Sequence, residues 1–256
     1  MGRIIAVANQ KGGVGKSTTA INLSACLAEK GKKVLAIDID PQGNTTSGIG
    51  VRKRNLKDTI YNILVDKDYD PRKAIIKTSV NNLDLIPASV DLAGAEVELV
   101  SVDGRENALK EGLDKIKGDY DYIFIDCPPS LGLLTINSLA AVDSVLVPIQ
   151  CEFYALEGVS QLVSTIELVK KSLNPKLEIQ GVILSMFDGR TNLSLQVVQE
   201  VKRYFGNKVY STVIPRNVRL AEAPSYGMPI TEYDPKSKGA EAYGDFADEF
   251  LELEED

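Results

Sequence analysis

The segment at residues 3–31 constrains the fold more than any other part of the chain. Residues 3–9 form a short apolar run rich in β-branched side chains, and residues 9–19 read Asn-Gln-Lys-Gly-Gly-Val-Gly-Lys-Ser-Thr-Thr. From Ser17 onward, apolar residues recur at helical spacing until Gly31, where a left-handed residue can end the helix. This order of strand, glycine-rich loop and helix predicts a phosphate-binding loop, because the helix N-terminus favours anionic phosphate.

The loop carries one lysine more than its usual pattern, G-x-x-x-x-G-K-[ST], requires. Gln10 stands where the first glycine would be, the extra lysine Lys11 follows it directly, and Lys16 already serves the phosphates of its own nucleotide. Phosphoryl transfer is catalysed mainly by positioning and by positive charge, which is often supplied in trans. We therefore expect Lys11 to cross a two-fold axis, so that two subunits enclose two nucleotides. The expected nucleotide-binding residues are Lys11, Gly12, Gly13, Val14, Gly15, Lys16, Ser17 and Thr18.

Length and composition favour one folded unit of the α/β class. The chain has 256 residues, of which 44% are hydrophobic and 25% charged, and no linker marks a second domain, so we expect a single domain over residues 1–256. Short apolar runs alternate with helical periodicity, which predicts a three-layer P-loop NTPase fold with a mostly parallel central sheet flanked by helices. Strands are expected at 3–9, 33–39, 83–86, 121–126, 144–149, 178–186 and 209–214. Helices are expected at 16–30, 91–101, 105–117, 131–141, 156–173, 193–205 and 237–252.

Several classes of function are disfavoured by what the sequence contains. It has no histidine, which excludes imidazole as a base or metal ligand, and its three cysteines have no paired spacing for zinc or a redox dithiol, so we expect buried reduced thiols. No apolar run approaches the roughly 18 residues of a membrane span, and no secretion leader is evident, so we expect a cytoplasmic protein. The net charge of −7 argues against generic nucleic-acid binding, although acidic residues crowd the C-terminal end and leave room for a local basic face.

Carboxylates follow two of the expected strands, at the sheet edge where ligands bind in open α/β folds. Asp126 closes an apolar strand, and we assign it to Mg²⁺ together with the hydroxyl of Ser17. Asp38 and Asp40 lie at the end of the second strand, where an acidic residue could orient or activate an attacking water. Asp40 is the better candidate because it opens the turn toward the phosphates, whereas Asp38 could equally cap the segment.

These motifs resemble those of a known family. The loop at 11–18, the Asp-Pro-Gln-Gly-Asn turn at 40–44 and the Asp-Cys-Pro-Pro-Ser segment at 126–130 look like the deviant Walker A ATPases, specifically the ParA/Soj chromosome-partitioning proteins. The resemblance runs over the whole chain. It includes the more specific segments at 152–158 and 213–225.

The resemblance implies an ATPase that dimerises with ATP and Mg²⁺ bound. Such a dimer binds double-stranded DNA without sequence preference on the nucleoid, and a centromere-binding ParB/Spo0J partner stimulates hydrolysis, which drives chromosome or plasmid partitioning. In the family, the residue matching Lys11 contacts phosphates across the dimer, that matching Asp40 supports the hydrolytic water, and those matching Pro215 and Asn217 contact the adenine. The C-terminal half offers five candidate cations for DNA, and the resemblance favours Arg190 and Arg219 over Lys202, Arg203 and Arg216.

Three other functions compete with this interpretation. A MinD-like membrane ATPase that positions the division site needs a basic amphipathic C-terminus, whereas residues 250–256 are acidic and would be repelled by anionic lipid. An iron–sulfur reductase resembling the nitrogenase iron protein needs a second cysteine to accompany Cys127, and residues 84–117 contain none. A non-catalytic, nucleotide-gated interaction module would differ only in lacking turnover.

Overall fold

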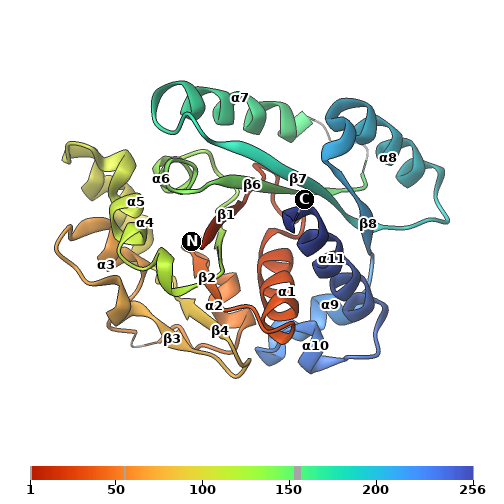
Figure 1. The fold of residues 1–256 in the computed structure, drawn as a ribbon, viewed down its shortest axis with the longest axis horizontal. Helices are drawn as coiled ribbons and strands as arrows, with labels where there is room; N and C mark the ends of the chain where they lie inside the picture. The colour runs from red at the N-terminus through yellow and green to blue at the C-terminus, as the bar shows by residue number, and fades with distance from the viewer. Residues whose placement is uncertain (1, 55, 153–156, 256) are drawn as a thin grey trace.

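The structure is a computed structural model that describes residues 2–54, 56–152 and 157–255. At its centre is an eight-stranded sheet with the strand order β3-β4-β2-β5-β1-β6-β7-β8 (Figure 1). Neighbouring strands run parallel except at the edge, where β3 is antiparallel to β4. The strands are β1 (Arg3–Val7), β2 (Val34–Asp38), β3 (Ile76–Lys77), β4 (Leu83–Ile86), β5 (Tyr122–Asp126), β6 (Ser144–Gln150), β7 (Glu178–Phe187) and β8 (Val209–Pro215).

The mostly parallel α/β sheet that the sequence predicts is confirmed. Each of the seven expected strands is present, with ends that agree to within two residues. The sequence did not reveal β3, because a strand of two residues is too short to show an alternating pattern. Strands β2, β5 and β6 are buried along their whole length, which explains why they read as nearly continuous apolar runs.

The helices fall into a long group that the sequence predicts and a short group that it does not. Each expected helix has a counterpart, although 91–101 contains a shorter α-helix followed by a 3₁₀ turn and 105–117 a shorter α-helix preceded by one. The four helices that were not expected have six residues or fewer, less than the two turns that make periodicity visible. The helices are α1 (Lys16–Glu29), α2 (Asn44–Gly48), α3 (Ile60–Val65), α4 (Leu92–Glu98), α5 (Ala108–Asp114), α6 (Leu133–Ala141), α7 (Glu157–Ser172), α8 (Asn192–Phe205), α9 (Val218–Glu222), α10 (Ile230–Tyr233) and α11 (Lys238–Glu255).

Two hydrophobic cores lie on the two faces of the sheet. Successive side chains of a strand point to opposite faces, so in β1 Ile4 and Ala6 join one core, and Ile5 and Val7 join the other. Helices α3 to α8 contribute to the first core. Helices α1 and α11, which lie side by side in Figure 1, contribute to the second. This layering fixes the carboxyl ends of the strands as a rigid edge on which loops can build a site.

Helix α11 is held on the sheet by an aromatic cluster, which gives a test of the packing. The ring of Phe250 is buried and lies 5.5 Å from Tyr122 and 5.9 Å from Phe124, between ring centroids. We expect Phe250→Ala to lower the free energy of unfolding by about 3–5 kcal/mol, because it leaves a cavity between α11 and β5. Urea unfolding measures this. The control Leu253→Ala, on the exposed side of α11, should change stability by no more than about 0.5 kcal/mol; equal losses would contradict the assignment.

Candidate nucleotide-binding site

The phosphate loop leaves β1 at Val7 and enters α1 at Lys16. Gly13 and Gly15 adopt left-handed backbone angles, with φ of 74° and 91°, which glycine tolerates without strain. A side chain on Gly12 or Gly13 would meet no atom within 4 Å, so the loop borders open space. The loop is tied to the sheet by the hydroxyl of Ser185, which donates to the Val14 carbonyl at 2.7 Å. It is therefore a preformed cradle in front of the N-terminus of α1.

The two lysines of the loop have different environments. The ammonium of Lys16 is buried within the loop and donates to the Lys11 carbonyl at 3.1 Å. Burial lowers the pKa of Lys16, although the nearby carboxylates of Asp126 and Asp40 oppose this shift. The Lys11 side chain is about a third exposed, and its Nζ lies 3.5 Å from Glu152 Oε2. Lys16 thus fills the cradle, whereas Lys11 is held by a carboxylate outside the loop.

Asp126 carries a buried oxygen that has no hydrogen-bond partner in the part of the chain that the structure describes. Its Oδ2 accepts a hydrogen bond of 2.7 Å from the hydroxyl of Thr45, whereas no described residue bonds Oδ1. Burial raises the pKa of Asp126 to about 6, against the opposing effects of hydrogen bonds from Ser17 and Thr45 and the charge of Lys16. A buried carboxylate oxygen close to a hydroxyl suits Mg²⁺, which prefers oxygen ligands. The residues present therefore fit the expected ion.

Asp38 and Asp40 have different environments. Asp38 is wholly buried beside Asp126, its register partner in the sheet, and accepts from the backbone N–H and hydroxyl of Thr46, both at 2.7 Å. A third bond, of 3.2 Å, comes from the N–H of Asp40. Asp40 accepts from the N–H of Gln42 at 2.9 Å and lines the cavity in front of the loop. Asp38 therefore organises the turn, and of the two only Asp40 lines that cavity.

Helix α2 supplies the partners of these carboxylates, and the sequence pattern does not predict this helix. Gly43 has a φ of 63° and its N–H donates to the Asp40 carbonyl at 2.8 Å, which closes the turn that starts α2. The next residues bring Thr45 to Asp126 and Thr46 to Asp38. The only sequence signal is a pair of threonines after the expected turn. Residue type alone does not show whether their hydroxyls bond the carboxylates or face the solvent.

Two adjoining cavities extend from the loop. The first, of about 600 Å³, is lined by the loop and by residues of α2 and the segment at 220–225. The second, of about 430 Å³, has a largely apolar lining that includes Pro215 and Asn217. The side chain of Asn217 also accepts the Arg219 N–H at 2.8 Å and so caps α9. The two cavities share Gly15, Thr18, Met186, Leu220 and Ala221. Together they offer a polar end for phosphates and an apolar end for a base.

Met186 is a lining residue that the sequence did not single out. It belongs to both cavities and has a φ of 53°, in the left-handed region that residues other than glycine rarely adopt. Such backbone strain persists where the surrounding structure imposes it, often at ligand sites. In the sequence, Met186 stands near the end of an apolar strand and resembles any other core residue.

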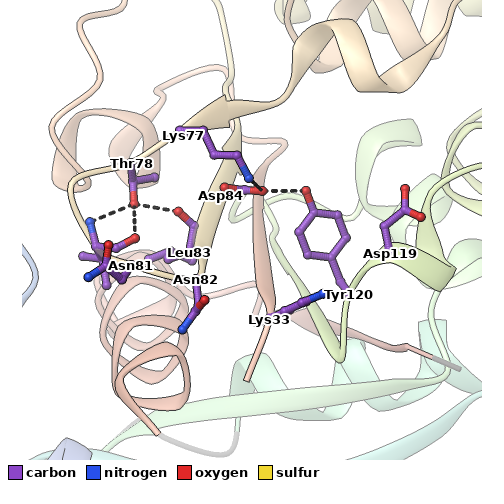
Figure 2. Close-up of a pocket in the computed structure, with 10 residues that line it drawn as sticks. Lys33, Lys77, Thr78, Asn81, Asn82, Leu83, Asp84, Asp119 and Tyr120 are labelled. Atoms are coloured by element: carbon purple, nitrogen blue, oxygen red, sulfur yellow. Dashed lines mark hydrogen bonds and ion pairs between the residues drawn. The ribbon is translucent and has the colours of Figure 1, made fainter. Parts of the chain in front are cut away.

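A further cavity, of about 450 Å³, lies at the opposite edge of the sheet (Figure 2). It borders the amino ends of β2 and β4. Its central carboxylate, Asp84, is already paired, because Lys77 Nζ lies 2.7 Å and the Tyr120 hydroxyl 2.8 Å from the same oxygen. Ligands of parallel α/β sheets bind beyond the carboxyl ends of strands. The candidate site is therefore the one at the phosphate loop.

The two arginines expected at DNA lie beyond the same sheet edge. Phe187 and Pro215 are register partners at the ends of β7 and β8, and Arg190 and Arg219 follow them within four residues. The Arg190 side chain is 89% exposed and makes two bonds, of 2.8 and 2.7 Å, to Asp188. Arg219 is half exposed and lies 2.8 Å from a Glu222 oxygen. Both arginines are thus accessible and already paired with acids.

The other three basic candidates lie in two different places. Lys202 and Arg203 belong to the last turn of α8, which ends shortly before β8 begins and so lies at the opposite edge of the sheet. Arg216 shares a carboxylate with Lys11, its guanidinium lying 3.6 Å from Glu152 Oε1. The structure therefore places Arg190, Arg216 and Arg219 beyond the carboxyl ends of β7 and β8, and Lys202 and Arg203 near the amino end of β8.

The cysteines and the helices bear on the competing functions. All three cysteines are free and buried, and burial raises the thiol pKa to about 12 for Cys26 and Cys127 and to about 11 for Cys151. Within the described residues, no group of three or more histidine, cysteine or acidic side chains is placed to hold a metal ion. No helix in the described part of the chain is long and apolar enough to cross a membrane.

Comparison with known proteins agrees with this geometry. A family model described as "AAA domain" matches residues 2–179. The chain is 62% identical to the sporulation initiation inhibitor protein Soj of Bacillus subtilis (strain 168), over 97% of this chain and 98% of Soj. It is 55% identical to the chromosome partitioning protein ParA of Myxococcus xanthus (strain DK1622), over 95% and 86%. A crystal structure of cobyrinic acid a,c-diamide synthase from Mycobacterium smegmatis, with ADP and magnesium, superposes with a TM-score of 0.85 at 42% identity, covering 97% and 93%.

The sheet, the cradle and the buried carboxylate define a P-loop nucleotide-binding enzyme with a second lysine in its loop. With relatives at this level of identity, the chain belongs to the ParA/Soj family of chromosome-partitioning ATPases. The family that the sequence motifs resemble is therefore confirmed. ATP hydrolysis in chromosome partitioning, rather than the MinD-like or iron–sulfur alternative, is its activity.

The buried carboxylates predict how stability depends on pH. Burial and the neighbouring Asp126 raise the pKa of Asp38 to about 7, so between about pH 4 and 7 the folded state binds more protons than the unfolded state. The free energy of unfolding should therefore fall as pH rises through this window. We expect Asp38→Asn, which cannot ionise, to reduce the slope by up to about 1.4 kcal/mol per pH unit. Urea unfolding of nucleotide-free protein at several pH values measures this, and an unaltered slope would contradict the assignment.

Proposed function

We propose that the chain acts, as one domain over residues 1–256, as an ATP-dependent DNA-segregation ATPase. In this proposal two subunits enclose two molecules of Mg²⁺-bound ATP, and the dimer binds double-stranded DNA without sequence preference. A ParB/Spo0J-type partner stimulates hydrolysis, which releases the DNA. The protein would then be cytoplasmic and associated with the nucleoid through its DNA-bound state.

The position of Lys11 is the observation that carries the dimer proposal. The ammonium of Lys16 already occupies the cradle, so a second ammonium from the same chain is not needed there. Within the described residues, the Lys11 side chain is held only by an ion pair of 3.5 Å with Glu152, and both side chains are partly exposed. Exposed ion pairs contribute about 0–1 kcal/mol to stability. Lys11 can therefore exchange Glu152 for a phosphate of the nucleotide bound in a facing subunit at little cost. A cation supplied in trans is the kind of group that accelerates phosphoryl transfer.

The remaining roles follow from the site. Ser17 and Asp126 would hold Mg²⁺, whose charge offsets the charge that develops on the phosphates. Asp40 borders the cavity with its carboxylate and would position the attacking water. Pro215 and Asn217 line the apolar cavity, which suits a purine base.

Binding to DNA needs a local cationic surface because the net charge is −7. Arg190 and Arg219 lie beyond one sheet edge, and each is paired with an exposed or partly exposed carboxylate. The oxygens of a DNA phosphate accept hydrogen bonds from a guanidinium as carboxylate oxygens do. The phosphate also belongs to a backbone of closely spaced negative charges. We therefore propose that these arginines exchange acid partners for phosphates, which also makes binding sensitive to salt.

The dimer proposal predicts that two substitutions affect different steps, dimerisation in one case and hydrolysis in the other. Lys11→Ala should weaken ATP-dependent dimerisation at least about tenfold, because it removes one charge-assisted contact from each of two equivalent sites. Static light scattering with ATP and Mg²⁺ measures this. Asp40→Ala is the matched control, and it should dimerise and bind DNA but lose hydrolysis. Normal dimerisation of Lys11→Ala would show that the cross-subunit role is wrong.

The DNA proposal predicts a change in salt dependence. Arg219→Glu and Arg190→Glu should each weaken DNA binding by the ATP-bound dimer and reduce the slope of log affinity against log salt by about 1, because each removes a phosphate contact. Fluorescence anisotropy with labelled duplex DNA measures both quantities. Lys202→Glu makes the same change of charge at the opposite edge and should have a smaller effect. Equal losses in all three variants would indicate a general charge effect instead.

A further inference from the structure

An apolar stripe lies exposed along α4 and the turns at its two ends. Its members recur at intervals of three and four residues, so they share one face of the helix. Val90, Val97 and Val100 are 76%, 75% and 62% exposed, and Ala93 lies between them. The opposite face of the same segment is buried in the core through Leu92, Ala95 and Leu99. The outward valines therefore have no packing partner in the described chain, which is typical of an interaction surface.

The stripe is bordered by acidic side chains. Residues 87–107 contain five acidic residues and one basic residue, Arg105. Asp91, Glu98 and Asp103 are exposed around the valines. The guanidinium of Arg105 is engaged by Glu106 at 3.2 Å and by the Val100 carbonyl. A peptide segment that binds here would therefore contact apolar side chains that are surrounded by negative charge.

The same segment is bonded to both loops that carry the site's carboxylates. The N–H of Ala88 donates to the Thr46 hydroxyl at 2.9 Å, and that hydroxyl donates to Asp38 at 2.7 Å. Further along, Glu96 Oε1 accepts the Leu134 N–H at 3.4 Å, in the first turn of α6, which follows the loop after Asp126. Helix α4 stands beside α3, on the face of the sheet that α3 to α8 cover (Figure 1). A displacement of α4 would thus be felt at α2 and in the loop after β5.

We propose that this α4 surface, formed by Val90, Ala93, Val97 and Val100 with Asp91, Glu98 and Asp103, docks a basic amphipathic helical segment of the stimulating partner. The proposal rests on the proposed function, because it gives that partner a place to act. Charge complementarity selects a basic occupant. A second copy of the chain is disfavoured, since a two-fold interface would set the same acidic patch against itself.

The test uses a double variant, Val97→Ser with Glu98→Lys, and a matched control, Leu253→Ser with Glu252→Lys, on the exposed side of α11. The direct probe is a fluorescein-labelled, 18-residue helical peptide of leucine and lysine, with a leucine and glutamate peptide for comparison. Anisotropy should show that the basic peptide binds the wild type and the control alike, and the α4 variant at least about tenfold more weakly. Turnover with DNA alone and ATP-dependent dimerisation should stay at the wild-type level in both variants.

A purified ParB/Spo0J-type protein then tests the link to hydrolysis. It should stimulate the wild type and the control but not the α4 variant. Equal peptide binding by the α4 variant, or no binding by the wild type, overturns the proposal, as does loss of dimerisation in the α4 variant, which would make this face the subunit contact. If peptide binding depends on the α4 surface but the partner leaves wild-type turnover unchanged, the docking surface stands and the proposed stimulation fails.

Discussion

The parallel pairing of β2 with β5 sets Asp38 beside Asp126 in the buried interior, and much of the site depends on this contact. Two carboxylates in such a place raise each other's cost of ionisation unless hydrogen bonds or a cation compensate. Thr45 and Thr46 compensate through α2, which is why so short a helix is held firmly against the sheet. One oxygen of Asp126 remains unbonded among the described residues, and it marks where positive charge is needed.

The same contact joins parts of the site that are far apart in the sequence. Thr46 links Asp38 to the backbone of Ala88, so the loops after β2 and β4 share one hydrogen-bond chain. Thr45 links the loop after β2 to Asp126, beside Ser17 and Lys16 of the phosphate loop. A change of charge at the phosphates would therefore act on α2 and α4 through these few hydrogen bonds. Such a route would serve the stimulation by a partner that is proposed above.

Sequence patterns predicted the long elements and the residues next to strand ends, but not the groups that satisfy them. Strand β5 and helix α1 are long enough to show their period, whereas α2 and α3 are too short. Asp38 and Asp40 are both acids at a strand end, and the sequence favoured Asp40 only because it opens the following turn. Strand β2 ends at Asp38, which bonds Thr46, whereas the turn closed at Gly43 leaves Asp40 at the cavity. Met186 gave no signal, since backbone strain is not written in residue type.

The sequence by itself determined the chemistry of the phosphate loop, because a strand, a glycine-rich loop and a helix N-terminus that follow one another are local features of the chain. It also determined that Lys11 is an extra cation. The tertiary structure decided which environment each charge has: Lys16 inside the cradle, Lys11 beside Glu152, and Arg190 and Arg219 beyond one edge of the sheet. The contact of Lys11 with Glu152 depends on strand order, which brings together residues more than a hundred positions apart, and the placing of the two arginines depends on the register of β7 and β8. No local pattern encodes either.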